Sequence, residues 1–328
     1  SKGIDLRKLD LNNFYLKDNL KVKFLKESFF SHINITQIKS VFNNDVIQFS
    51  SFFYKLTIWY LFLAIIFNKK VVISPRGEFY SAALKRKSFI KMIYINLFKI
   101  FKKSINFHAT NQQEKKLIKN IFPKSNIVVI PNLINLPICY NLKKNNNIIF
   151  LGRINPIKNI DILIKAYSCL SSNTKSEFSL LIVGEAFLDY EKKYLNKLKL
   201  IIEENKLENQ VKFLGPIYGE DKLKILSESF CLVLPSKSEN FGNVVLEAIS
   251  QNTPVIASKN TPWEILKENN AGYWVDASVG SIKNALNEII LIDDEKYTQI
   301  QKRAKNLLDK RFSFKNNISL WGKYYSKL

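Results

Sequence analysis

Short apolar runs alternate with amphipathic stretches along most of the chain, and the alternation is most regular after residue 147. Short apolar runs bounded by polar residues are typical of buried strands, whereas apolar residues at intervals of three and four predict helices. Strands that alternate with helices predict a parallel sheet covered by helices on both faces. The strands are expected at residues 45–49, 70–74, 105–110, 127–130, 147–151, 178–183, 211–214, 231–234, 254–257 and 273–275.

The chain of 328 residues is too long for one ordinary domain and suits two. Pro137 and the polar run 143–147 interrupt the pattern between residues 136 and 146. We therefore expect two Rossmann-like α/β domains, at residues 1–140 and 141–311, and a final helix at 312–328 that crosses back onto the first. Residues 1–26 lack the apolar strand and glycine-rich turn with which such a domain normally opens, which is consistent with a missing first strand.

The net charge of +22 is distributed unevenly along the chain. Residues 1–140 contain 23 cationic against 7 acidic side chains, and residues 141–328 contain 27 against 21. Within the first part, residues 84–103 form a helical pattern that mixes a wide apolar face with cations. Basic amphipathic helices commonly lie on anionic membranes. The alternative is an ordinary core-facing helix with a basic solvent side, but the excess of cations across the whole domain favours a membrane surface.

The spacing of the cysteines and the length of the apolar runs indicate in which cellular compartment the protein lies. Three single cysteines and two distant histidines have no ligand-like spacing, so neither a zinc site nor a disulfide framework is expected. The longest apolar run, residues 56–67, is too short to cross a bilayer, which needs about 20 residues. We expect a cytoplasmic protein that is peripheral on the inner face of the cell membrane.

The segment 234–248 carries the strongest chemical signal. A strand is expected to end at Leu234, a loop with Glu239 and Gly242 follows, and a helix begins near Asn243. Backbone N–H groups and the positive end of a helix dipole favour an anion at such a place. Glu239 and Glu247 could accept hydrogen bonds from the hydroxyl groups of one sugar-containing ligand. The alternative is a helix N-terminus that carries acids only for its dipole.

A second signal lies at the first strand-to-helix turn of the second domain, in the sequence from Gly152 to Lys158. Arg153 and Lys158 flank this turn and could converge on a diphosphate, Arg with its planar fork and Lys as a point charge. The alternative is a pair of solvated cations in a basic protein. Because both signals follow strands of the same predicted sheet, a shared site is favoured.

Together these two motifs resemble the nucleotide-sugar site of family 4 glycosyltransferases. That family has the GT-B fold, in which two Rossmann-like domains face each other across a cleft. The resemblance spans essentially the whole second domain, including residues 183–185, 213–215 and 254–257. It implies that Arg153 and Lys158 hold the donor diphosphate, while Glu239 contacts the transferred sugar and Glu247 the ribose. Further donor-binding positions implied by it are Gly152, Gly184, Asn240, Phe241, Gly242, Asn243 and Val244.

In the first domain, the segment 73–78 resembles a segment found in family members that build bacterial surface polysaccharides. Arg76 is expected to meet an acceptor or donor phosphate, and Glu78 to assist the acceptor hydroxyl; the alternative is a structural turn. His108 ends the next strand. It either lines the cleft or belongs to the core, and a histidine of the core or one that supports a site residue is the favoured interpretation.

The resemblance implies a retaining, metal-independent hexosyltransferase that uses a UDP- or GDP-linked sugar and no other cofactor. Together with the cationic first domain, it implies a saccharide acceptor on a lipid diphosphate carrier, in O-antigen or capsule-type synthesis. The alternatives are a GT-B-fold sugar-nucleotide epimerase or phosphorylase and, more distantly, a basic nucleic-acid-binding protein. No nucleic-acid-binding motif is present, and a nicotinamide-dependent enzyme would need a GxGxxG turn, which the sequence lacks. The sugar, nucleobase and linkage stay open.

Overall fold

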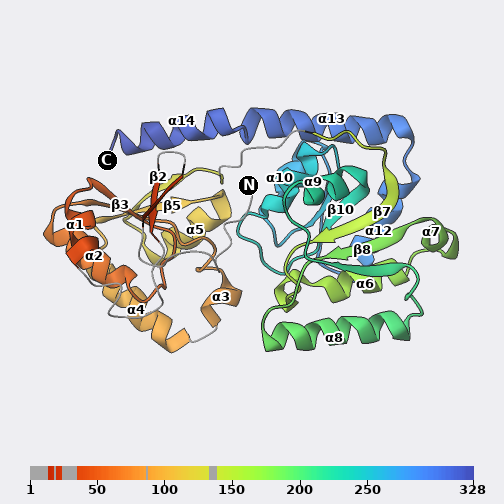
Figure 1. Cartoon of the computed structure of the whole chain (residues 1–328), viewed down its shortest axis with the longest axis horizontal. Coiled ribbons are helices and arrows are strands. Elements are labelled where there is room, and N and C mark those ends of the chain that lie inside the picture. The colour runs from red at the N-terminus through yellow and green to blue at the C-terminus, as the bar shows by residue number, and fades with distance from the viewer. Residues whose placement is uncertain (1–13, 18–19, 24–34, 86–87, 133–138) are drawn as a thin grey trace. The chain divides into compact units, whose positions relative to one another are not determined.

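The computed structural model of the chain describes residues 14–17, 20–23, 35–85, 88–132 and 139–328 (Figure 1). Its described residues divide into two compact units. The first contains the chain up to Ala109, Glu114–Val128 and Leu328, and the second contains Thr110–Gln113 and Val129–Lys327. Pro137, at the expected boundary, lies outside the described residues. The domain limits inferred from the sequence stay a prediction.

The first unit is built on a four-stranded sheet in the order β3-β4-β5-β6. Its strands β3 (Val46–Phe49), β4 (Lys70–Ile73), β5 (Ile105–Ala109) and β6 (Asn126–Val129) confirm the four strands expected there. The β3–β4 and β4–β5 pairs are parallel. The helices are α1 (Ile35–Phe42), α2 (Thr57–Ile66), α3 (Ser81–Lys85), α4 (Ser88–Ile100) and α5 (Gln112–Ile121).

One feature of this unit agrees with the sequence prediction and another differs from it. Of the helix expected at residues 84–103, the end of α3 and all of α4 are observed, and Arg86 and Lys87 lie outside the described residues. An antiparallel hairpin, β1 (Phe14–Lys17) and β2 (Leu20–Lys23), lies within the N-terminal segment where no strand was expected.

The second unit contains a six-stranded parallel sheet in the order β12-β11-β10-β7-β8-β9. Its strands are β7 (Asn145–Leu151), β8 (Ser179–Val183), β9 (Val211–Gly215), β10 (Ser229–Leu234), β11 (Val255–Ser258) and β12 (Tyr273–Val275). All six confirm strands expected from the sequence. The helices are α6 (Ile160–Ser168), α7 (Ser172–Glu177), α8 (Asp189–Glu204), α9 (Gly219–Glu228), α10 (Asn243–Ser250), α11 (Glu264–Glu268), α12 (Val279–Leu291), α13 (Asp294–Arg311) and α14 (Phe314–Tyr325).

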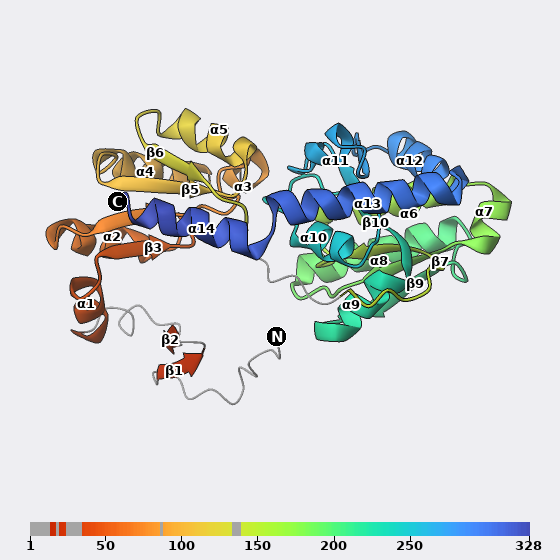
Figure 2. The same cartoon turned by 90° about the horizontal axis from the view of Figure 1, so that it is seen from above.

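Successive residues of a strand point to opposite faces of the sheet. Because both sets are apolar here, helices cover both faces. On β7, Ile148 and Phe150 are buried against residues of α6, α8 and α12, whereas Ile149 is buried against residues of α10, α11 and α13. Figures 1 and 2 show these helices packed around the sheet in two layers. The continuous apolar runs in the sequence therefore reflect strands buried on both faces.

The strand order positions a crevice at one edge of the sheet. From β7 the chain moves outward through β8 and β9, and it then returns to place β10, β11 and β12 on the other side of β7. After β7 the chain therefore continues toward β8, and after β10 toward β11, which are opposite directions along the sheet. In open parallel sheets, ligands bind at such a reversal, outside the carboxyl ends of the strands.

Candidate functional site

The loops that follow β7 and β10 are joined by an ion pair at this reversal. Lys158 Nζ lies 2.5 Å from Glu239 Oε2, and both side chains are largely but not fully buried. Lys158 ends a short 3-10 turn after β7, and Glu239 lies in the loop between β10 and α10. The two residues that the sequence pointed to independently thus meet at one place.

Backbone contacts hold these two loops together beside the ion pair. Lys237 N donates to Ile157 O at 2.8 Å, and the buried Asn159 side chain donates to Pro235 O at 3.2 Å. Asn159 adopts a left-handed conformation, with φ of 58°, at the point where the 3-10 turn passes into α6. The chain's own contacts therefore hold the two loops together.

The N-terminus of α10 begins at Gly242, the N-cap residue, whose φ of 76° favours glycine. A Cβ atom there would lie only 3.2 Å from Glu239 Cγ and from Trp263 Nε1. The Trp263 indole is buried and donates from Nε1 to the Phe241 carbonyl at 2.5 Å. This packing directs the first N–H groups of α10 to the strand-end edge, where they can bind an anion.

The second glutamate of the motif lies on α10 and is also paired. Glu247 Oε1 accepts from Lys222 Nζ at 2.8 Å, and Lys222 belongs to α9. The pair leaves the second carboxylate oxygen of Glu247 available for a hydroxyl group. Lys222 has no signal in the sequence, because a lysine in the first turns of an amphipathic helix normally faces solvent.

Arg153 is held by a carboxylate that was not expected from the sequence. Its Nε lies 3.2 Å from Oε1 of Glu191, whose side chain is completely buried, whereas 52% of the Arg153 side chain is exposed. Glu191 also accepts from Asn155 Nδ2 at 2.6 Å and from the backbone N–H groups of Phe187 and Leu188. Burial alone would raise the pKa of Glu191, but these donors and the Arg153 charge lower it below its ordinary value. Glu191 is therefore an ionised, buried carboxylate.

The only signal for Glu191 in the sequence is its place in the first turn of α8, three residues after the N-cap Leu188. A glutamate at that position commonly accepts a hydrogen bond from the N-cap backbone. That role is fulfilled here, because Leu188 N donates to Glu191 Oε2 at 3.2 Å.

Arg153 and the ends of β7 and β8 also line a pocket of about 230 Å³. Its floor depends on a close backbone approach, because a Cβ atom on Gly184 would lie 1.9 Å from the Gly152 carbonyl oxygen. Exposed Phe187 and Tyr218 stand at its margin. The pocket is therefore shaped by glycine backbones and suits a flat or polar ligand group near the Arg153 guanidinium.

In the first unit, Arg76 is exposed and has a left-handed backbone with φ of 48°. Glu78 accepts from Ser51 Oγ at 2.6 Å and from the backbone N–H groups of Phe52 and Phe53. Its carboxylate thus orders the loop after β3. The arrangement favours the structural-turn interpretation of Glu78, and its expected catalytic role stays a prediction.

His108 is buried on β5, and its Nδ1 lies 2.9 Å from the Ser74 hydroxyl. Nearby, the buried Glu114 accepts from Gly77 N at 2.7 Å. These contacts bind the turn after β4 to β5 and α5. They agree with a histidine that supports the segment 73–78 from within the core.

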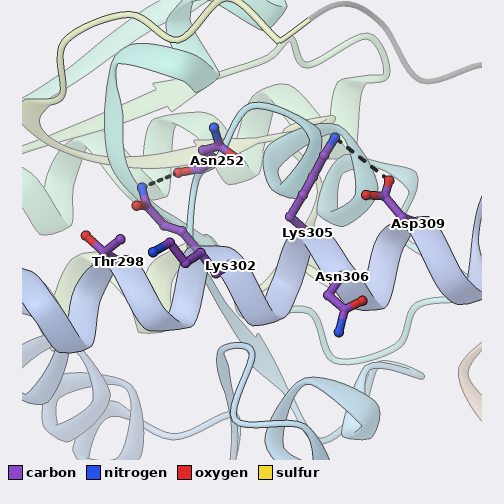
Figure 3. Close-up of a pocket in the computed structure, with 7 residues that line it drawn as sticks. Asn252, Thr298, Lys302, Lys305, Asn306 and Asp309 are labelled. Atoms are coloured by element: carbon purple, nitrogen blue, oxygen red, sulfur yellow. Dashed lines mark hydrogen bonds and ion pairs between the residues drawn. The ribbon is translucent and has the colours of Figure 1, made fainter.

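A larger hollow of about 440 Å³ lies along α13 and is shown in Figure 3. Gln301 donates to the Asn252 carbonyl at 2.7 Å there, and Lys305 pairs with Asp309 at 4.0 Å. Most of its lining belongs to the side of one helix, away from the strand ends. We therefore place the candidate site at the β7–β10 reversal and not in this hollow.

Two kinds of feature are absent from the described part of the chain. No helix among these residues is long and apolar enough to span a membrane. Within the same residues, no three side chains of His, Cys, Asp or Glu gather in a group that could hold a metal ion.

Comparison with known proteins gives consistent matches. The α-1,3/1,6-mannosyltransferase ALG2 of Dictyostelium discoideum is 30% identical over 71% of this chain and 57% of that protein. The O-antigen chain mannosyltransferase B of Escherichia coli is 30% identical over 37% of this chain and 31% of that protein. The chain thus spans less than two thirds of the length of these curated relatives.

The solved structure of Anabaena HepE, in complex with UDP and glucose, has the same fold, with a TM-score of 0.75. At 19% identity, it aligns with 89% of this chain and 81% of its own. Together with the two parallel-sheet units, this similarity confirms the predicted fold class, the α/β architecture of GT-B proteins. The family described as "Glycosyl transferases group 1" matches residues 137–307, more than half of the sequence. The chain therefore belongs to the group 1 glycosyltransferases.

Proposed function

We propose that this protein is a retaining glycosyltransferase of family 4, which transfers a sugar from a UDP- or GDP-linked donor to a saccharide acceptor. The acceptor would be attached to a lipid diphosphate, in the synthesis of a bacterial surface polysaccharide of O-antigen or capsule type. Family membership and the similarity to an O-antigen mannosyltransferase support this proposal. The observation that carries it is the Lys158–Glu239 pair beside the N-terminus of α10.

The donor diphosphate would occupy the edge formed by Arg153, Lys158 and the first N–H groups of α10. Here the two cations and the helix end supply positive charge for a group that gains negative charge as it leaves. Lys158 forms an ion pair with Glu239. A bound diphosphate would share Lys158, and Glu239 would then accept hydrogen bonds from hydroxyl groups of the transferred sugar.

The ribose would lie beside Glu247, whose carboxylate is kept in place by Lys222. The acceptor hydroxyl would attack the anomeric carbon on the face from which the diphosphate departs. A new carbon–oxygen bond forms as the bond to the diphosphate breaks, and the departing phosphate oxygen takes the hydroxyl proton. Configuration is retained, and no metal or further cofactor enters this scheme.

The protein would act in the cytoplasm, on the inner face of the cell membrane. The excess of 23 cationic over 7 acidic side chains in residues 1–140 supports this location, because anionic lipids attract cations.

The test is transfer of radiolabelled sugar from a panel of UDP- and GDP-sugars to lipid-linked acceptors, comparing the wild type with Glu239→Ala and Lys158→Ala. Lys296→Ala is the matched control, because it removes an exposed Lys–Asp pair at the start of α13. We expect transfer to fall at least about a hundredfold in both site variants and to stay unchanged in the control. Undiminished transfer in both folded variants would show that the active site lies elsewhere.

The same assay separates a transferase from the alternative epimerase or phosphorylase. A transferase releases the nucleotide only when an acceptor saccharide is present. An epimerase converts the nucleotide sugar without an acceptor, and a phosphorylase requires inorganic phosphate.

A further inference from the structure

Helix α4 presents its apolar side to solvent. Along this 13-residue helix only Phe98 is buried, whereas six large apolar side chains are exposed. Four of them follow one another at helical intervals of four, four and three residues and thus form one line. The six exposed residues are Phe89, Ile90, Met92, Ile93, Leu97 and Ile100.

Polar contacts on the inner side fix this orientation. Lys91 Nζ donates to the Ala83 carbonyl at 2.5 Å and lies 4.9 Å above the centre of the Phe53 ring. The Tyr94 hydroxyl donates to the Tyr54 carbonyl at 2.9 Å, and burial raises the pKa of Tyr94 to about 12. Rotating α4 to bury its apolar line would break these contacts. The exposed line is therefore the arrangement that the unit favours.

Helix α2 contributes a second apolar line on the same unit. Trp59, Phe62 and Ile66 are exposed at intervals of three and four residues. The Tyr94–Tyr54 hydrogen bond joins α4 to the segment that leads into α2, and both helices lie next to one another in Figures 1 and 2. We call the exposed apolar residues of these two helices the α2–α4 face.

Cations flank the α2–α4 face, and acids are scarce around it. Residues 84–103 contain seven Lys and Arg and no Asp or Glu. Of the described cations among them, Lys85, Lys99, Lys102 and Lys103 are exposed. The nearby acids Glu78 and Glu114 accept hydrogen bonds from backbone N–H groups of their own unit. An apolar surface with this charge fits an anionic layer, whereas a second copy of the chain would bring like charges together.

We infer that the α2–α4 face inserts into the interfacial region of a bilayer that contains anionic phospholipid. Its apolar side chains enter the boundary between headgroups and acyl chains, and the flanking lysines contact lipid phosphates. The inference deepens the proposed function, on which its biological meaning rests, because a lipid-linked acceptor is found at such a surface.

The test is flotation of the full chain with vesicles of phosphatidylcholine, with and without phosphatidylglycerol. Ile93→Ser combined with Leu97→Ser should reduce binding to the anionic vesicles about tenfold or more. Leu291→Ser, at an apolar residue on α12 of the second unit that is more exposed than Ile93 and Leu97, should leave binding unchanged. Tryptophan emission of the wild type should shift to the blue on binding, and Trp59→Phe should remove most of that shift.

Three results would overturn the inference: no flotation of the wild type, equal flotation of the double variant, or a blue shift that persists in Trp59→Phe. Self-association that the double variant abolishes, without any vesicle binding, would identify the face as an interface between copies. Transfer to a soluble acceptor saccharide should survive in the double variant. Loss of vesicle binding with transfer intact therefore separates this inference from the proposed function, which is tested by transfer alone.

Discussion

Arg153 is oriented by Glu191, a carboxylate that has no contact with solvent. The Nε–Oε1 distance of 3.2 Å engages the inner nitrogen of the guanidinium, and the exposed half of the Arg153 side chain lies beside the pocket at the ends of β7 and β8. The terminal amino groups of Arg153 are thereby left for a ligand. An arginine fixed in this way loses less side-chain entropy when it binds a phosphate.

We expect Glu191 to act on donor binding through Arg153. Glu191→Gln should weaken UDP or GDP binding about tenfold in the wild-type background but less than about twofold in an Arg153→Ala background, because coupled residues are not additive. The measurement is a double-mutant cycle by titration calorimetry, using only variants whose folded fraction has been verified. Equal losses in both backgrounds would mean that Glu191 serves the fold and not Arg153.

The lowered pKa of Glu191 predicts a specific pH dependence of stability. A carboxyl group whose folded-state pKa lies below its ordinary value of 4.5 stabilises the fold above that pH. The contribution is lost as the pH falls through the folded-state pKa. The free energy of unfolding of the wild type should therefore exceed that of Glu191→Gln by about 3 kcal/mol above pH ~5, and the difference should shrink below it. Urea unfolding across this pH range measures the difference, and a constant difference would contradict an ionised Glu191.

Gly184 is required by the approach of two backbone segments. Gly184→Ala would place a Cβ atom 1.9 Å from the Gly152 carbonyl oxygen, so one strand end must move. We expect a loss of about 3 kcal/mol in the free energy of unfolding, together with weaker nucleotide binding. Gly280→Ala is the control, because its Cβ meets no atom within 4 Å and the residue lies in α12. That variant should be neutral or slightly more stable in thermal unfolding.

Trp263 supports the N-terminal end of α10 through one hydrogen bond. Trp263→Phe keeps an aromatic ring against Phe241 and Phe312 but removes the donor to the Phe241 carbonyl. We expect a cost of about 1–3 kcal/mol in stability and a weaker affinity for the donor nucleotide. In the matched control Trp274→Phe, the lost bond to Thr261 O is longer, at 3.2 Å, and is only partly buried. A nucleotide affinity that falls equally in both variants would argue against a special role for Trp263.

The strands and the central pair of the site could be predicted because each has a local signal. Apolar runs between polar segments marked the strands, and Glu239 and Lys158 follow strand ends within glycine-containing motifs. Parallel strands carry their C-terminal loops to one edge, so the meeting of these residues followed from topology. The start of α10 after Gly242 was also predictable, because it follows a strand end in the same glycine-containing motif.

Glu191, Lys222 and Trp263 could not be identified in this way. An acid at the start of α8 and a lysine on α9 are common on solvated helix surfaces, and their sequence spacing from Arg153 and Glu247 carries no signal. Their roles arise because loops far apart in the sequence fold over them. Trp263 likewise reaches the Phe241 carbonyl only because β10 and β11 are neighbours.

The sequence by itself determined the α/β class, the strands of the four- and six-stranded sheets, the cationic character of the first part and the two motifs that meet at the candidate site, because periodicity and strand-end chemistry are local. Only the tertiary structure decided which side of α4 faces solvent. An amphipathic pattern shows that two sides differ, but which side is buried depends on the partners that pack against it. Here Lys91 and Tyr94 find those partners in Ala83 and Tyr54, and the apolar line is left exposed.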